Sequence, residues 1–366
     1  MKLTKQGKRL VVWAVSALCV SFTSTAAMAG TYSSIVSFGD SLSDVGTYRV
    51  STIAAVGGGE YTVNNGGGTN WTEQLAKGLF APAPCAAQTG LNSVIPGIPA
   101  VPVTDHPECS NYAQGGSRVT NPVGPGNLYT YPADPGGALG QLTDPVVNQV
   151  NRYLSSHGGQ FSGGELVTVL AGGNDVFMNL ATVAATAAAT GNDPTAVATA
   201  SANAVAAMGQ AGADLASLIK NQMVAKGARY VVALTLPDVS QTPFALSKDA
   251  ATRTLISTMV TTFNSQLTAG LSGVNRVLIA DAYSQGRLQN AYPQLFGLSN
   301  TANMACDLSK TILPTSLVCT SNTLIAGDTS RYEYADSVHP TPYAHKLLAG
   351  FVYLKLFARG WLFPAN

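Results

Sequence analysis

The sequence predicts an α/β fold in which helices cover both faces of a parallel β-sheet. Four short segments are almost continuously apolar and have the length of buried strands: 34–38, 165–171, 229–236 and 276–280. Longer segments with a helical spacing of apolar residues separate them, and no repeat of about 20–50 residues is visible. Because buried strands that alternate with helices are typical of parallel sheets, we expect a three-layer α/β/α domain with about five central strands.

The helices are expected between these strands. One should cover 138–155 and another should cover 250–271. The alanine-rich segment predicts a pair of helices with a break near Gly191. Asp193 would cap the second helix of this pair, which should extend over 194–226 with a proline at its first position.

Three further segments are rich in glycine, proline and polar residues and are expected to be loops: 57–69, 81–109 and 121–137. Long loops in a compact domain tend to carry function, and here they should gather around the strand ends. No linker divides the chain after residue 29, so we expect one domain over residues 30–366.

The first 29 residues have the pattern of a signal peptide. A basic start precedes an apolar run over 10–22, and the small-x-small sequence at 27–29 fits a cleavage site. The run is short for a membrane span, which needs roughly 20 apolar residues. We expect export to the periplasm or the medium, with an uncleaved anchor as the alternative. Leu18 precedes Cys19, where a lipoprotein needs a small residue, so we expect no lipid anchor.

Cysteine usage agrees with export. Beyond the signal peptide the chain has four cysteines, an even number: Cys85, Cys109, Cys306 and Cys319. Four cysteines allow three pairings, and short loop closure favours Cys85–Cys109 with Cys306–Cys319. A zinc site is the alternative, but no Cys-x-x-Cys spacing or neighbouring histidine cluster supports it.

The charge of the chain argues against a nucleic-acid partner. The full sequence has a formal net charge of +1, and removal of residues 1–29 takes away four basic side chains. The remaining 16 basic and 19 acidic side chains give about −3, without any basic run. Proteins that bind nucleic acid carry a basic patch or stripe, so we expect none as a partner.

Four short segments hold polar residues of the kind used in serine hydrolysis: 39–42 (Gly-Asp-Ser-Leu), 111–117 (Asn-Tyr-Ala-Gln-Gly-Gly-Ser), 172–175 (Gly-Gly-Asn-Asp) and 336–339 (Asp-Ser-Val-His). Each alone would be an ordinary turn sequence. In this order, with the first and third at predicted strand ends, they resemble the four blocks of the GDSL, or SGNH, family of esterases and lipases. The resemblance extends from about Ser34 to the end of the chain, and it implies a flavodoxin-like strand order.

The segment 335–341 (Ala-Asp-Ser-Val-His-Pro-Thr) looks closest to the branch of this family whose members are often passenger domains of autotransporter esterases. We expect the chain to depart from that architecture, because the sequence ends at Asn366.

The resemblance implies a serine, histidine and aspartate triad. Ser41 would attack an ester carbonyl, and His339 would take the proton of Ser41 and later give it to the leaving alcohol. Asp336 would accept a hydrogen bond from the other imidazole nitrogen. The backbone N–H groups of Ser41 and Gly116 and the side-chain amide of Asn174 would stabilise the oxyanion. Alignment on Asn111 favours Gly116 over Gly115, but this choice stays open.

Other catalytic layouts fit less well. The α/β-hydrolase nucleophile elbow is Gly-x-Ser-x-Gly, whereas Ser43 occupies the position of its last glycine. No His-Glu-x-x-His motif occurs and the three other histidines are scattered, so we expect neither a catalytic metal nor a cofactor. The histidines outside the triad, together with Asp44 and Asp175, are expected to be structural.

The resulting hypothesis is an exported carboxylic ester hydrolase that forms an acyl-enzyme. The expected substrates are short- to medium-chain acyl or aryl esters. A lipase or phospholipase, with transient contact with a membrane or lipid surface, is the nearest alternative, followed by a polysaccharide O-acetyl esterase. A non-catalytic adhesin or binding passenger is the alternative hypothesis that does not involve an enzyme. The sequence leaves the oligomeric state open.

Overall fold

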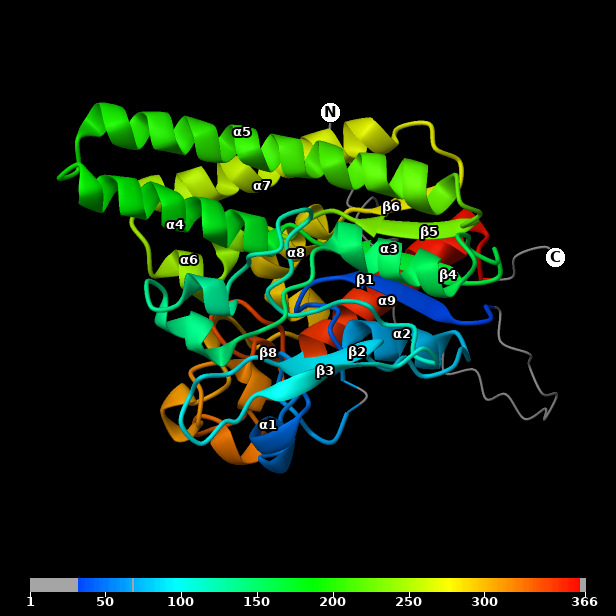
Figure 1. Cartoon of the computed structure of the whole chain (residues 1–366), viewed down its shortest axis with the longest axis horizontal. Coiled ribbons are helices and arrows are strands. Elements are labelled where there is room, and N and C mark those ends of the chain that lie inside the picture. Colours follow the sequence, from blue (N-terminus) through cyan, green and yellow to red (C-terminus); the bar gives the residue numbers. More distant parts are fainter. Residues whose placement is uncertain (1–31, 68, 363–366) are drawn as a thin grey trace, which may run out of the picture.

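The structure is a computed structural model that describes residues 32–67 and 69–362. The expected signal peptide, residues 1–29, lies outside the described residues. Within the described part, four parallel strands form the central sheet in the order β1-β4-β5-β6 (Figure 1): β1 Ile35–Gly39, β4 Leu166–Leu170, β5 Tyr230–Leu234 and β6 Val277–Ala280. Each lies at a segment predicted to be a strand, which confirms the α/β fold with a parallel sheet.

The sheet of the described residues has one strand fewer than the five expected. Beside β1, the fifth position holds a single parallel bridge between Ser37 and Asn111. Backbone hydrogen bonds of 3.1 and 2.8 Å join Ser37 to the residues on either side of Asn111. Farther along, Gln114 N donates to Gly39 O at 3.2 Å, so the segment 110–114 lies beside β1 as an irregular edge of the sheet. If the bridge is counted, the order corresponds to that of a flavodoxin-like sheet.

The helices form a layer on each face of the sheet (Figure 1). One layer contains α3 Val146–Ser156, α4 Gly173–Ala189, α5 Pro194–Leu218 and α7 Ala250–Leu271, and the other contains α2 Trp71–Gly78 and α9 Pro342–Arg359. Side chains of β1 alternate between the layers: Val36 and Phe38 belong to the first core, whereas Ile35 belongs to the second. Burial on both sides of a strand explains why the strands have continuous apolar sequences.

Shorter elements complete the fold: α1 Ser51–Ala55, α6 Pro243–Leu246, α8 Ala282–Ala291, the antiparallel hairpin of β2 Gln88–Leu91 with β3 Val101–Asp105, and the parallel pair of β7 Asn300–Met304 with β8 Tyr332–Tyr334. The hairpin lies in the segment 81–109, so the prediction of a continuous loop there is wrong. The prolines of this segment favoured the loop prediction, but an edge strand such as β3 tolerates a proline.

The capping and breaking residues set the helix boundaries. Asp193 accepts a hydrogen bond from Ala196 N at 2.8 Å at the start of α5, as predicted, and α7 covers the predicted range 250–271. α5 ends earlier than predicted, at Leu218, and a π-helical turn over 219–224 follows it. The helix predicted over 138–155 begins only at Val146, because the proline before it disfavours helical backbone in the preceding residues.

Within the described residues, two disulfides join Cys85 to Cys109 and Cys306 to Cys319. This is the pairing that short loop closure favours. The first encloses the β2–β3 hairpin, and the second closes a segment that lies beside β8 through the contact of Cys306 N with Ala335 O at 2.9 Å. Disulfides of this kind fit a protein that folds in an oxidising compartment.

None of the described helices has the length and hydropathy that a bilayer span requires.

Two glycines in helices give opposite predictions for stability. A Cβ atom at Gly212 of α5 would lie 2.3 Å from the carbonyl oxygen of Phe263 in α7, whereas a Cβ at Gly350 of α9 would meet nothing within 4 Å. Gly212→Ala should therefore lower the free energy of unfolding by about 1–3 kcal/mol through overpacking. Gly350→Ala should raise it by about 0.5–1 kcal/mol, because alanine loses less backbone entropy. Urea denaturation measures both, and equal effects would contradict the close helix contact.

Candidate active site

Ser41 lies in the turn that follows β1, at the carboxyl edge of the sheet. β1 ends at Gly39, where the chain runs so close to β4 that a Cβ atom would lie 2.1 Å from the carbonyl oxygen of Leu170. The Asp40 carboxylate then closes the turn by accepting a hydrogen bond from Leu42 N at 3.1 Å. In this turn the Ser41 side chain lines a pocket, although only 9% of the residue is exposed.

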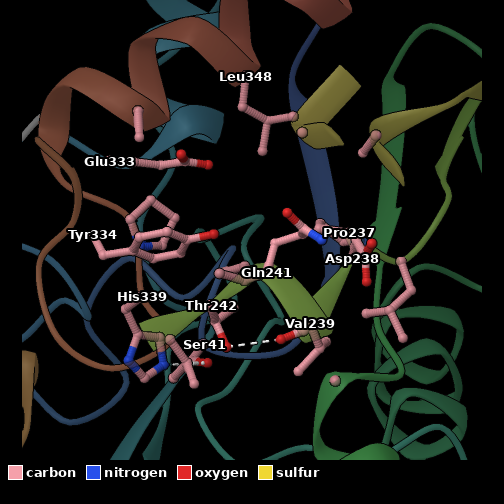
Figure 2. A pocket seen from close by; sticks show the side chains of 18 of the residues that line it. Ser41, Pro237, Asp238, Val239, Gln241, Thr242, Glu333, Tyr334, His339 and Leu348 are labelled. Carbon is pink, nitrogen blue, oxygen red and sulfur yellow. Dashed lines mark hydrogen bonds between the residues drawn. The ribbon is translucent and has the colours of Figure 1, made fainter. Parts of the chain in front are cut away.

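His339 approaches Ser41 from the loop between β8 and α9. Its Nε2 lies 2.9 Å from Ser41 Oγ (Figure 2). Its Nδ1 lies 2.9 and 2.8 Å from the two carboxylate oxygens of Asp336. The structure thus brings together Ser41, His339 and Asp336, the three residues predicted from the sequence as nucleophile, base and orienting carboxylate.

The Asp336 carboxylate is buried and accepts hydrogen bonds from three backbone N–H groups. Oδ1 accepts from Val338 at 3.0 Å and from His339 at 2.8 Å, and Oδ2 accepts from Ser316 at 2.8 Å. Burial alone would raise the pKa of Asp336, but the charge of His339 and these hydrogen bonds outweigh it and hold the pKa below its usual range. Asp336 is therefore ionised at neutral pH and fixes the orientation of the imidazole.

Two contacts of this triad were missed from the sequence. The Ser316 N–H belongs to the segment closed by the second disulfide, and a backbone donor has no sequence signature. Tyr61, which is buried, lies on the imidazole of His339 with ring centroids 4.8 Å apart. Tyr61 belongs to the predicted loop 57–69, and that prediction of a functional loop was the available signal.

The two glycines of the second block have different surroundings. Gly115 N donates to the Asp44 carboxylate at 2.9 Å, and a Cβ atom at Gly115 would lie 2.3 Å from Tyr61 Oη. Among the residues that the structure describes, the backbone N–H groups of Gly116 and Ser41 donate no hydrogen bond. A Cβ atom at Gly116 would lie 2.4 Å from Pro125 O. The N–H of Gly115 is therefore engaged, whereas that of Gly116 is available to a substrate.

Asn174 lies in the first turn of α4, and its side chain lines the same pocket as Ser41. Its Nδ2 donates to Ser117 O at 2.8 Å. This hydrogen bond fixes the amide and leaves its second N–H available. The positions of Ser41, Gly116 and Asn174 are therefore compatible with an oxyanion site.

Several polar residues near the site have structural contacts. Asp44 accepts from the backbone N–H groups of Gly46 and Thr47 at 2.9 and 2.8 Å, and Asp175 accepts from Arg118 Nε at 2.9 Å. These contacts agree with the prediction that both aspartates are structural. His345 is buried in α9, burial lowers its pKa to about 3, and its neutral Nδ1 accepts from Trp71 N at 3.3 Å.

A pocket of about 140 Å³ lies beside Ser41 and His339 (Figure 2). Apolar side chains cover much of its wall: Leu42, Phe177, Leu236, Val239, Val338 and Leu348. Polar side chains from α8 and β8, with Glu333 among them, line another part. The pocket can therefore hold an apolar chain next to the Ser41 hydroxyl.

A wider groove of about 760 Å³ lies between α4, α5 and α7. Phe177 and Val338 line both the groove and the pocket. Ala184 of α4 and Phe244 of α6 line its mainly apolar wall. The groove thus adjoins the pocket along one side.

Among the residues that the structure describes, no cluster of three or more His, Cys, Asp or Glu side chains could hold a metal ion.

Comparison with known families identifies one match, and two further proteins are similar to the chain. The sequence matches the family model for GDSL-like lipase/acylhydrolase over residues 35–351. A curated protein from Pseudomonas putida, described as an uncharacterized protein in the trpE-trpG intergenic region, is 26% identical over 366 residues. That match covers 95% of this chain and 52% of the relative, so the chain spans about half of the relative's length. The crystal structure of an extracellular lipase from Streptomyces rimosus aligns with a TM-score of 0.40 and 14% identity, over 88% of this chain and 99% of that chain.

The contact between Tyr61 and His339 generates a prediction on stability. The Tyr61 hydroxyl is buried without a hydrogen-bond partner among the described residues. Tyr61→Phe keeps the ring and removes this hydroxyl, so the free energy of unfolding should rise by up to about 1 kcal/mol. Tyr61→Ala leaves a cavity and should lower it by about 3–5 kcal/mol. Urea denaturation of both variants is the measurement, and a strongly destabilised Phe variant would speak against an unpartnered hydroxyl.

Proposed function

The chain belongs to the GDSL-like lipase/acylhydrolase family, and we propose that it hydrolyses carboxylic esters through an acyl-enzyme on Ser41. The observation that carries this proposal is the hydrogen-bonded chain from Ser41 Oγ through His339 to Asp336, with distances of 2.9 Å and 2.8 Å. Family membership supports the ester hydrolase activity in general, and the geometry supports the roles of these residues.

In the proposed reaction, Ser41 Oγ attacks the ester carbonyl carbon while His339 Nε2 takes the hydroxyl proton. The new C–O bond gives a tetrahedral intermediate, which collapses as the bond to the alcohol breaks and His339 protonates the leaving alcohol. Water then attacks the acyl-enzyme while His339 takes its proton, and the bond to Ser41 Oγ breaks as His339 returns that proton to Ser41, which releases the carboxylic acid. The ionised Asp336 holds the imidazole in the required tautomer and stabilises its charged form.

The negative charge on the carbonyl oxygen needs donors that are in place before the reaction. We assign this task to the backbone N–H groups of Ser41 and Gly116 and the side-chain amide of Asn174. Their donors are available, whereas the N–H of Gly115 already binds Asp44 at 2.9 Å. This difference supports Gly116 as the backbone donor of the second block.

The size of the pocket supports short- to medium-chain esters as substrates. About 140 Å³ beside Ser41 is a small volume, and apolar side chains cover much of its wall. A short acyl or aryl group would be desolvated there.

We also propose that the protein is exported through the segment 1–29, which its two disulfides support.

A lipase or phospholipase is a second candidate function, and the groove between α4, α5 and α7 favours it. The groove shares Phe177 and Val338 with the pocket. A long acyl chain that leaves the pocket at these residues could follow the apolar wall of the groove. Such a substrate would require contact with a lipid surface, since long-chain esters are poorly soluble.

Ser41→Ala tests the first proposal. The variant lacks the nucleophile, so its kcat for nitrophenyl butyrate should fall by about 10⁴-fold or more. Ser33→Ala, which changes an exposed serine just before β1, is the matched control and should keep the wild-type rate. Hydrolysis by purified Ser41→Ala at the wild-type rate would refute the mechanism.

Ala184→Arg tests the second candidate. Ala184 is exposed on α4 and lines the groove, whereas the neighbouring Ala185 is exposed but does not line it. If the groove holds an acyl chain, the charged side chain should lower the ratio of kcat/KM for dodecanoyl over butanoyl esters by about tenfold. The reason is that a long chain in the groove would bury a polar group without a partner, which is unfavourable. Ala185→Arg should leave the ratio unchanged. Equal ratios in both variants would favour the short-chain esterase.

A further inference from the structure

Glu333 is a buried carboxyl that the proposed reaction does not use. It is the middle residue of β8 and lies three positions before Asp336. Only 8% of the residue is exposed, and it lines the pocket beside Ser41. Figure 2 shows its carboxyl pointing into the pocket from the same side as Tyr334 and His339.

One oxygen of the Glu333 carboxyl has no partner among the described residues. Its Oε2 is the only buried carboxylate oxygen in the described residues that lacks a hydrogen-bond partner. Burying a polar group without a partner is costly, so the large majority of buried polar groups have one. An unsatisfied oxygen in the wall of a pocket therefore points to a partner supplied by a bound molecule.

The other two carboxyls of the pocket wall are already engaged. Asp40 accepts from Leu42 N at 3.1 Å, and Asp238 binds Arg287 Nη1 at 2.6 Å and accepts from Ser240 Oγ at 2.6 Å. Glu333 is thus the carboxyl that remains available to a ligand. This arrangement is unlike a site for a cation, in which several free carboxylates converge.

The protonation state of Glu333 indicates the chemistry of that ligand. Burial raises the pKa of Glu333 to about 8, and the neighbouring Tyr334 hydroxyl offsets part of the rise. At pH 7 the group is therefore mainly a neutral carboxylic acid, which has one O–H donor and a carbonyl acceptor. A neutral hydroxyl, itself both donor and acceptor, is the simplest group that matches it.

The polar wall around Glu333 fits the same ligand. The amides of Gln241, Gln285, Gln289 and Asn290 line the pocket together with Tyr334. Gln285, Gln289 and Asn290 belong to α8, and their spacing along the sequence places them on one face of this helix. Amide side chains donate and accept hydrogen bonds without charge, as hydroxyl recognition requires.

We propose that Glu333 binds a hydroxyl of the substrate, so that the protein prefers esters with a hydroxylated chain over the same esters with a plain alkyl chain. This inference rests on the proposed ester hydrolysis at Ser41. An alkyl chain in the pocket would leave Oε2 of Glu333 dehydrated and unpaired, and such a loss gives strong discrimination. The hydroxyl belongs either to the acyl chain or to the alcohol.

The experiment measures a ratio of kcat/KM values in two arms. The acyl arm compares nitrophenyl ω-hydroxyhexanoate with nitrophenyl hexanoate, and the alcohol arm compares butanediol monobutyrate with butyl butyrate. The wild-type enzyme should prefer the hydroxylated ester by at least about tenfold in one arm, which identifies the source of the hydroxyl.

Two variants of Glu333 make the test specific. Glu333→Met has a similar length but no hydrogen-bonding group, so the preference should disappear. Glu333→Gln keeps a donor and an acceptor and should retain most of it. A wild-type ratio near one in both arms, or a preference that survives Glu333→Met, would overturn the proposal. Faster hydrolysis of an ω-ammonio ester than of the ω-hydroxy ester would also overturn it, since Glu333 would then act as an anion.

Binding separates this inference from the proposed function. The Kd values of the same four esters are measured by ligand-observed NMR on Ser41→Ala and on Ser41→Ala/Glu333→Met. A hydroxyl preference in binding, lost in the double variant, supports the Glu333 site even if wild-type protein hydrolyses no ester. Hydrolysis by wild type without a hydroxyl preference in either assay supports the proposed function and refutes the Glu333 site.

Discussion

The arrangement at the sheet edge depends on the buried carboxylate of Asp336. A buried charge is tolerated only when hydrogen bonds compensate for its lost hydration, and here three backbone N–H groups and an imidazole supply them. These donors come from two segments, the loop before α9 and the segment that contains Ser316. The same contacts that satisfy Asp336 therefore hold His339 over the end of β1. Stability and the proposed chemistry depend on one set of hydrogen bonds.

Local sequence patterns predicted most of the fold. The four strands and the helix 250–271 were found because apolar runs and capping residues are properties of neighbouring positions. The helix over 138–155 was overextended because the pattern of apolar residues continued across Pro145, which ends helical backbone. The fifth strand is present only as the irregular edge 110–114 beside β1, and this pairing arises only when segments distant in the sequence meet.

Local sequence also predicted part of the candidate site. Ser41, Asp336 and His339 belong to short blocks whose order along the chain resembles that of a known family. Tyr61 and Glu333 belong to no such block, and their relevance follows from packing against residues far away in sequence. The buried state of Glu333 could not be predicted, because a Tyr-Glu-Tyr strand usually exposes its charged residue. The structure instead buries this carboxyl in a wall shared by β8 and α8.

The Cys306–Cys319 disulfide has a consequence for the mobility of the triad. The loop that it closes contains Ser316, whose N–H donates to the Asp336 carboxylate at 2.8 Å. A cross-link of this kind restricts the conformations open to the segment that it closes. The covalent link therefore limits how far the Ser316 N–H can move from Asp336, and the orientation of His339 depends in part on a bond that forms by oxidation.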